Sequence, residues 1–398
     1  MYNYSFHTHT FRCGHAKFCK DEDYVINYIK NNFKTIGFSD HMPLGKMCLP
    51  HERERMDLSQ LNNYIKSVRK LNRKYKNINI LCGLECEYSK DLEKHLVFLK
   101  EKCDYLILGQ HFIDEIEPIN NPEYPLYYAN TICKAISTGL FDYIAHPDIF
   151  LKYRDTISEE NKNIYEENCI KATKIICSKA SNLNIPLEID LSFLNNIKIM
   201  NDNNYPYPHI NFFKIAKDYN LNYVIGINAH IPKDILKFDK SMEKVRKIIP
   251  NNINILNDYN PITYRKEHKN LDKMYNKFKN NSKSYEYYII KSILKGNKSK
   301  DIFQNIIDRL YYLKRYSKKM ALEYQLNLIK EIDTINNSII KLENKQSLIK
   351  RKKDFIKFIK KSNKVREKSF NQIINNIIKM SHRYVKKDLI KKIKEYYS

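Results

Sequence analysis

The sequence predicts an α/β protein in which parallel strands alternate with helices, followed by a basic helical extension. Seven short apolar runs are separated by longer amphipathic segments. This alternation is typical of parallel βα units, arranged either as a closed barrel or as a doubly wound sheet. The charge is divided unevenly. Residues 1–265 hold 35 Lys and Arg against 32 Asp and Glu, whereas residues 266–398 hold 35 against 13.

The predicted strands are short runs rich in Ile, Val, Tyr and Phe. In chain order they are Tyr2–His9, Ile36–His41, Ile78–Tyr88, Tyr105–Phe112, Tyr143–His146, Ile185–Leu191 and Tyr223–Ala229. The segments between them include Leu58–Tyr75 and Asn161–Leu183, where apolar residues recur at helical spacing. We therefore expect helices to cover the strands.

Each predicted strand leads from apolar residues into His, Asp or Glu. In the first strand, His7 and His9 point the same way, because residues two apart share a face. The full set is His7, His9, His15, Asp40, His41, Glu85, Glu87, His111, His146, Glu188, Asp190, Asn228 and His230. In (β/α) barrels the carboxyl ends of the strands carry the active site. Imidazole and carboxylate groups bind divalent metals, so the set predicts a metal site.

Three histidines, His51, His95 and His209, do not end a strand. We expect them to be structural or exposed to solvent.

Several segments together resemble a known family. They are FHTHTFRCGHA, GFSDHMP, ERERMDLSQLNNYI followed by INILCGLECEY, YLILGQHF, DYIAHPDIF, PLEIDLS, and YPYPHINFFKIAKDYNLNYVIGINAH. In this order they resemble the PHP (polymerase and histidinol phosphatase) metallo-phosphoesterases, over about residues 1–235. The segment around Arg55 and Met56, and the YPxP motif, resemble the histidinol-phosphate phosphatase branch in particular.

The resemblance implies a distorted (β/α)7 TIM-like barrel, which we expect over residues 1–265. It also implies three divalent metal ions, commonly Zn, Mn or Fe. By motif, His7, His9, Glu85 and residue 228 would hold the first ion. The second would take His15, His41 and His230, and the third His111 and His146 with Glu85 bridging. The family usually has Asp at position 228, whereas this chain has Asn228; its amide can coordinate a metal but supplies no negative charge.

The implied reaction is hydrolysis of L-histidinol phosphate to L-histidinol and phosphate, a step of histidine biosynthesis. We expect in-line attack by a metal-bound hydroxide, without a phospho-enzyme. Asp40 and Glu87 are expected to orient ligating imidazoles. Arg154 and Arg55 are expected to hold the phosphate, and Arg154 is expected to be a catalytic residue. Asp190 is expected to contact the imidazole and ammonium groups of the substrate.

Two alternatives remain open from the sequence. One is a PHP phosphoesterase acting on another small phosphate ester. The other is a nucleic-acid phosphodiesterase or binding protein that uses the barrel or the basic extension.

Composition predicts a protein of the cytoplasm with no membrane partner. The chain has no apolar run of about 18 residues, and its first residues do not resemble a signal peptide. The nine Cys all precede residue 178 and form no CxxC pair. We interpret them as reduced thiols.

The extension, residues 266–398, is expected to be helical. The break at Gly296 favours a helical hairpin over a helix-turn-helix motif. Apolar residues recur every seven positions from Leu328 to Ile356, a stripe that would serve either a hairpin or self-association. Basic runs beyond Lys350 could contact the phosphates of a nucleic acid, or form a solvated face.

Overall fold

The computed structural model describes residues 2–43, 54–113, 116–195 and 207–282. The predicted hairpin, heptad stripe and basic runs beyond residue 282, together with His51, lie outside these residues. Among the described residues, no helix is both long enough and apolar enough to span a membrane.

Eight parallel strands form one sheet in the order of the sequence. They are β1 (Tyr4–Ser5), β2 (Thr35–Phe38), β3 (Asn79–Cys86), β4 (Tyr105–Leu108), β5 (Tyr143–Ile144), β6 (Leu187–Asp190), β7 (Asn222–Gly226) and β8 (Asn254–Ile255). All seven predicted strands are present, and each ends earlier than predicted. The polar residues at their carboxyl ends therefore lie mostly in the loops just after the strands.

The sheet curls until its first and seventh strands meet. Just past β1, the backbone N–H of His9 donates to the carbonyl of Ala229, 2.9 Å away, and the N–H of Ala229 donates to the carbonyl of His7. The eighth strand pairs with the opposite end of β7, where the hydroxyl of Tyr4 donates to the carbonyl of Leu256. The predicted α/β barrel is confirmed, with β8 as an unforeseen addition.

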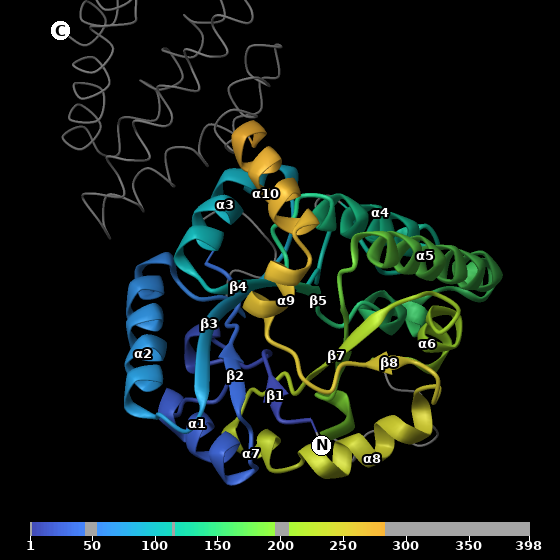
Figure 1. Ribbon diagram of the computed structural model, residues 1–398. Helices are drawn as coiled ribbons and strands as arrows, with labels where there is room; N and C mark the ends of the chain where they lie inside the picture. Colours follow the sequence, from blue (N-terminus) through green and yellow to red (C-terminus); the bar gives the residue numbers. More distant parts are fainter. Residues whose placement is uncertain (1, 44–53, 114–115, 196–206, 283–398) are drawn as a thin grey trace, which may run out of the picture. The chain divides into compact units, whose positions relative to one another are not determined.

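Helices surround the strands, as Figure 1 shows. They are α1 (Asp21–Lys30), α2 (Leu61–Lys74), α3 (Glu93–Lys102), α4 (Tyr124–Ile136), α5 (Lys162–Leu183), α6 (Ile210–Ala216), α7 (Pro232–Ile235), α8 (Phe238–Ile248), α9 (Pro261–Glu267) and α10 (Asn270–Asn281). Of these, α2 and α5 match the two helices predicted above. The α2 helix buries Leu61, Tyr64, Val68 and Leu71 along one face, as a stripe at helical spacing requires.

Aromatic side chains fill the interior of the barrel below the strand ends. Tyr4, Phe6, Tyr105, Tyr143 and Tyr259 belong to one buried cluster. The hydroxyl of Tyr105 lies 2.7 Å from the carbonyl oxygen of Phe6 and 2.9 Å from that of Phe38. This hydroxyl is therefore satisfied in spite of its burial, as a buried polar group requires.

An ionic cluster closes the amino end of the barrel. Asp142, just before β5, accepts hydrogen bonds from Lys100 (2.6 Å), from Nε of Arg265 (2.7 Å) and from the backbone N–H of Leu106 (2.8 Å). Arg265, on α9, also donates to the carbonyl of Gly139. The compact unit that contains the barrel thus includes α9 and α10.

Candidate metal centre

The side chains expected to bind metal gather at the carboxyl end of the barrel. His7 and His9 follow β1, His41 follows β2, Glu85 is on β3, and His111 and His146 follow β4 and β5. Asn228 and His230 follow β7, and His15 comes from the loop after a short 3-10 turn at Phe11–Cys13. They come from several separate parts of the chain, and the parallel register of the strands brings them to one edge.

Glu85 is the centre of this arrangement. Its Oε2 lies 3.4 Å from Nε2 of His7, 3.4 Å from Nε2 of His9 and 3.0 Å from Nδ1 of His41. Its Oε1 lies 2.9 Å from Nε2 of His146 and 3.6 Å from Nε2 of His111. One carboxylate therefore faces five imidazoles, three at one oxygen and two at the other.

The donor atoms fall into groups small enough to share an ion. Within 4.8 Å of one another lie the donors of His7, His9 and Glu85, those of His9, His41 and His230, and those of Glu85, His111 and His146. The Nε2 atoms of His15 and His230 are 2.7 Å apart. These groups, with His15 beside His230, bring together every residue expected to hold the three ions except Asn228. Asn228 lines a cavity together with His9, His41 and His230.

Several of these atoms are buried without a hydrogen-bond partner among the described residues. They are Nε2 of His7, Nδ1 of His41, Nδ1 of His146, Oε2 of Glu85 and Oδ1 of Asn228. Buried polar atoms in proteins are nearly always hydrogen-bonded. Such a concentration at one site fits residues whose missing partners are metal ions.

The protonation of three of the imidazoles also suits metal binding. Burial lowers the pKa of His9, His41 and His230 well below the ordinary value for histidine. These rings are therefore neutral near pH 7 and keep a free lone pair. Neutral imidazole is the form that ligates a metal.

Second partners hold the rings in orientation. Nδ1 of His230 lies 3.0 Å from the carbonyl oxygen of Asn228, and Nδ1 of His111 lies 3.0 Å from Oε1 of Glu87. Nδ1 of His7 lies 2.9 Å from Oε1 of Glu188. Contacts of this kind fix the tautomer and leave Nε2 for the metal.

The two carboxylates expected to orient imidazoles behave differently. Glu87 makes the expected contact with His111. Asp40 lies 3.7 Å from Nδ1 of His9, which is too far for a hydrogen bond. It accepts instead from the hydroxyl of Thr10 and from the backbone N–H of His41. Glu188 plays the orienting role that the sequence analysis did not assign to it.

Glycines make room for two of the carboxylates. A Cβ at Gly109, just past β4, would lie 1.9 Å from Oε1 of Glu85 on the neighbouring strand. A Cβ at Gly226, at the end of β7, would lie 1.8 Å from Oε1 of Glu188 on β6. Only glycine permits such close approach at these positions.

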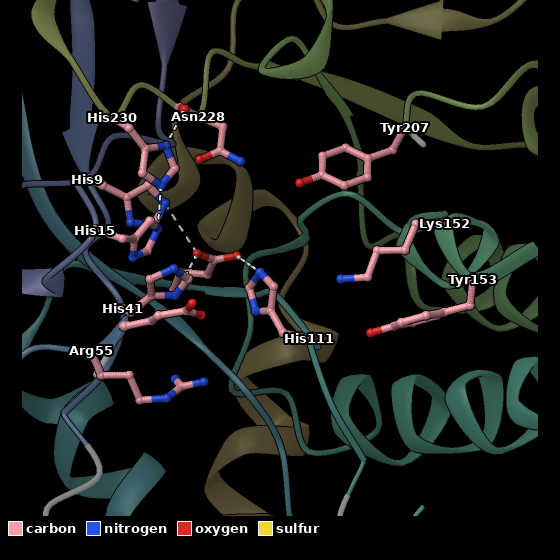
Figure 2. Close-up of a pocket in the computed structure, with 12 residues that line it drawn as sticks. His9, His15, His41, Arg55, His111, Lys152, Tyr153, Tyr207, Asn228 and His230 are labelled. Carbon is pink, nitrogen blue, oxygen red and sulfur yellow. Dashed lines mark hydrogen bonds and ion pairs between the residues drawn. The ribbon is translucent and has the colours of Figure 1, made fainter. Parts of the chain in front are cut away.

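Beside the donor groups lies a cavity of about 230 Å³. Figure 2 shows Lys152, Tyr153 and Tyr207 across this space from His9, His15, His41 and His230. The ring of Tyr207 also lies 5.2 Å from that of His146, centroid to centroid. The cavity thus combines metal-binding donors on one wall with a cation and two phenols on the other.

Two of the residues expected to hold substrate lie elsewhere. Arg154 makes two hydrogen bonds to Glu166, of 2.5 and 2.6 Å, and does not line the cavity. The cation of this segment that does line the cavity is Lys152, two residues earlier on the same 3-10 segment (Ile149–Thr156). In a 3-10 helix each residue turns the side chain by about 120°, so residues two apart face different ways. Asp190 is buried and lies outside the cavity lining.

Arg55 does line the cavity. Its guanidinium makes two hydrogen bonds to Glu87, of 2.5 and 2.6 Å. It is therefore already paired with an anion that in turn holds His111.

The histidines expected to be structural fit that expectation where they are described. His209 begins α6, and its Nδ1 accepts a hydrogen bond from the backbone N–H of Asn211. His95 lies 2.5 Å from the carbonyl oxygen of Pro43 through Nε2. Neither belongs to the donor groups above.

Residues 5–189 match the PHP domain family model. A structure from Listeria monocytogenes, described as a candidate histidinol phosphatase, shares 19% identity and a TM-score of 0.48 over 58% of this chain and 97% of that one. A histidinol phosphate phosphatase from Lactococcus lactis subsp. lactis, complexed with zinc, L-histidinol and phosphate, shares 16% identity and a TM-score of 0.45 over 64% and 95%.

No curated protein matches the chain. The assignment therefore rests on the family match together with the motifs and the donor cluster. Residues 5–189 of the chain are therefore identified as a PHP domain.

Proposed function

We propose that this protein is a metal-dependent phosphomonoesterase that hydrolyses L-histidinol phosphate to L-histidinol and phosphate. The observation that carries the proposal is the position of Glu85, whose two oxygens face five imidazoles. Four of these rings have a buried nitrogen without a hydrogen-bond partner among the described residues. Such a carboxylate is suited to bridge divalent ions. The cavity that Glu85 lines also contains the ammonium-bearing side chain of Lys152 in its wall.

The ions would be held by the three donor groups described above. When bound, divalent ions lower the pKa of a water molecule and neutralise the charge of a phosphate group. Their identity is not specified by these ligands, because zinc, manganese and iron all accept imidazole and carboxylate.

Lys152 is the protein's own candidate for binding the phosphate. It lines the cavity opposite the histidines, and its ammonium lies 4.9 Å from the centroid of the Tyr153 ring. A lysine on this wall would hold the phosphate oxygens as a point charge. Arg55 would act mainly through Glu87, which it holds beside His111.

The size of the cavity favours a small substrate. A volume of about 230 Å³ is below the roughly 300–1,000 Å³ typical of pockets for drug-sized ligands. Tyr153 and Tyr207 offer phenol hydroxyls and ring faces, which can contact a substrate imidazole. These features, with the motifs of the histidinol-phosphatase branch, support L-histidinol phosphate as the substrate.

The test is a substrate panel on the purified full chain, with and without added Mn²⁺ or Zn²⁺. The panel contains L-histidinol phosphate, other small phosphomonoesters and a phosphodiester. We expect metal-dependent phosphate release with the highest kcat/KM for L-histidinol phosphate. Preference for another monoester would overturn the substrate, and the absence of metal-dependent turnover on every ester would overturn the activity.

A matched pair of variants tests the phosphate site. Lys152→Ala should raise KM for the best substrate about tenfold, since a charge-assisted hydrogen bond contributes roughly 1.5 kcal/mol. Arg154→Ala removes a cation from the same segment but outside the cavity, and should leave KM within about twofold. Equal effects of the two substitutions would argue against Lys152 as the phosphate contact.

A further inference from the structure

Asn228 is held in an unusual backbone conformation at the edge of the donor groups. Its φ is 49°, in the left-handed region that Asn and Asp tolerate better than most residues. The residue is 6% exposed. Its Oδ1 is buried without a hydrogen-bond partner, and the side chain lines the cavity beside His9 and His230.

The other end of the amide is fixed by Asp190. Nδ2 of Asn228 donates to Oδ2 of Asp190 at 2.8 Å. The second oxygen of Asp190 accepts from the backbone N–H of Ser192 at 2.7 Å, and Asp190 is 1% exposed. Both oxygens of Asp190 thus accept hydrogen bonds, and the NH₂ group of Asn228 faces this carboxylate. The carbonyl oxygen therefore faces the donor groups.

We infer that Asn228 and Asp190 act as one coupled unit at the metal centre. Asn228 would supply a neutral oxygen ligand, and Asp190, as a positioning residue, would orient that ligand and supply the negative charge behind it. The inference rests on the metal site of the proposed function. Asp190 would thus orient the metal ligand Asn228, whereas the sequence led us to expect that Asp190 contacts the substrate.

The hydrogen bond between Asn228 and Asp190 predicts how substitutions at these two positions act on each other. Asn228→Asp would place a second carboxylate at hydrogen-bond distance from Asp190, and the two like charges would repel each other in a buried site. Asp190→Asn would leave two amides, with no anion to select the orientation of Asn228. The double variant, Asn228→Asp with Asp190→Asn, restores one carboxylate and one amide with the hydrogen bond reversed.

The experiment measures Mn²⁺ affinity by calorimetry and melting temperature by scanning calorimetry on the metal-free full chain. Asp190→Asn should weaken Mn²⁺ binding by about 10–100-fold, the usual effect of losing a partner that orients a ligand. Asn228→Asp should lower the melting temperature of the metal-free protein. The double variant should recover both quantities to near the wild-type values, which is the strong non-additivity of residues in direct contact.

Additive effects of the two single substitutions would overturn the inference, as would wild-type affinity in Asp190→Asn. Asp142→Asn, at the other end of the barrel, is the control for loss of a buried carboxylate and should leave Mn²⁺ affinity unchanged. Phosphate release is measured separately. Non-additive effects of the two substitutions on Mn²⁺ binding, without any phosphate release, would overturn only the proposed phosphatase activity. Phosphate release with additive effects of the two substitutions would overturn only the Asn228–Asp190 unit.

Discussion

The two ends of the barrel treat buried charge in opposite ways. At the amino end, Asp142 has hydrogen bonds from Lys100, Arg265 and the backbone of Leu106, so the anion is fully neutralised by the protein. At the carboxyl end, Glu85 faces five imidazoles. Burial lowers the pKa of His9 and His41, so these rings are neutral near pH 7, whereas in His7 the carboxylates of Glu188 and Glu85 outweigh burial and raise the pKa. Several of their nitrogens have no hydrogen-bond partner among the described residues.

This difference separates a structural cluster from a functional one. A buried charge pair that is complete within the protein holds elements together. A buried cluster whose polar atoms lack hydrogen-bond partners within the protein lowers the stability of the fold unless a ligand such as a metal ion binds these atoms. The predictions below test whether the two ends differ in this way.

The largest expected effect is at the carboxyl end. Glu85→Gln keeps the shape of the side chain but removes the charge that would bridge two ions. We expect phosphatase activity to fall by at least about 1,000-fold, because bound metal supplies several kcal/mol of transition-state stabilisation. Bound metal, measured by mass spectrometry, should fall with it. Glu166→Gln, which removes a carboxylate outside the cavity, is the control and should keep both.

At the amino end, Asp142→Asn should affect stability and spare activity. It leaves Lys100 and Arg265 without their anion, and breaking a buried ion pair typically costs about 3–5 kcal/mol. Urea unfolding should show this loss in the free energy of unfolding. The kcat of the folded fraction should be unchanged. A reduced kcat with normal stability would mean that the two ends are not independent.

Removal of metal should destabilise the carboxyl end of the barrel and leave the amino end unchanged. A chelator should lower the free energy of unfolding by about 3 kcal/mol if metal was present at about 100 times its dissociation constant. Hydrogen exchange should become faster in the loops after β1, β2, β5 and β7. The segments around Asp142 and α9 should exchange as before. Uniform acceleration over the whole barrel would contradict a metal site confined to one end.

The smallest effect is the pH dependence of the amino-end cluster. Burial would raise the pKa of Asp142, but Lys100 and Arg265 outweigh this and lower the pKa below its ordinary value. A lowered pKa in the folded state gives stability that is present above the unfolded pKa, roughly 3.9, and is lost as pH falls through the folded pKa. The stability difference between wild type and Asp142→Asn should therefore shrink from about pH 4 downwards. A constant difference would show that Asp142 is not ionised in the fold.

Much of this arrangement follows from periodicity in the sequence. The seven runs of apolar residues correspond to strands β1 to β7, and the polar residues that follow them meet at one edge, because parallel strands align their carboxyl ends. The short β8 was not predicted, since two residues, Asn254 and Ile255, give no periodic signal. Its position depends on pairing with the first residues of β7, a contact across strands that the sequence of β8 alone does not reveal.

The sequence could not predict contacts across strands or the phase of short helices. Lys152 and Arg154 cannot be distinguished until the 3-10 geometry of their segment is known. Glu188 and Asp190 both face the centre from β6, but their partners, His7 and Asn228, come from β1 and β7. One strand does not reveal its neighbours' side chains. The sequence alone therefore shows that Asn228 is neutral, but not that a carboxylate lies behind it.

The two glycines beside the carboxylates limit how the enzyme could be altered. Any side chain at Gly109 or Gly226 would displace Glu85 or Glu188, and so would disturb the ligand set before it changed the shape of the cavity. New substrate preferences are therefore accessible through the opposite wall, at Lys152, Tyr153 and Tyr207.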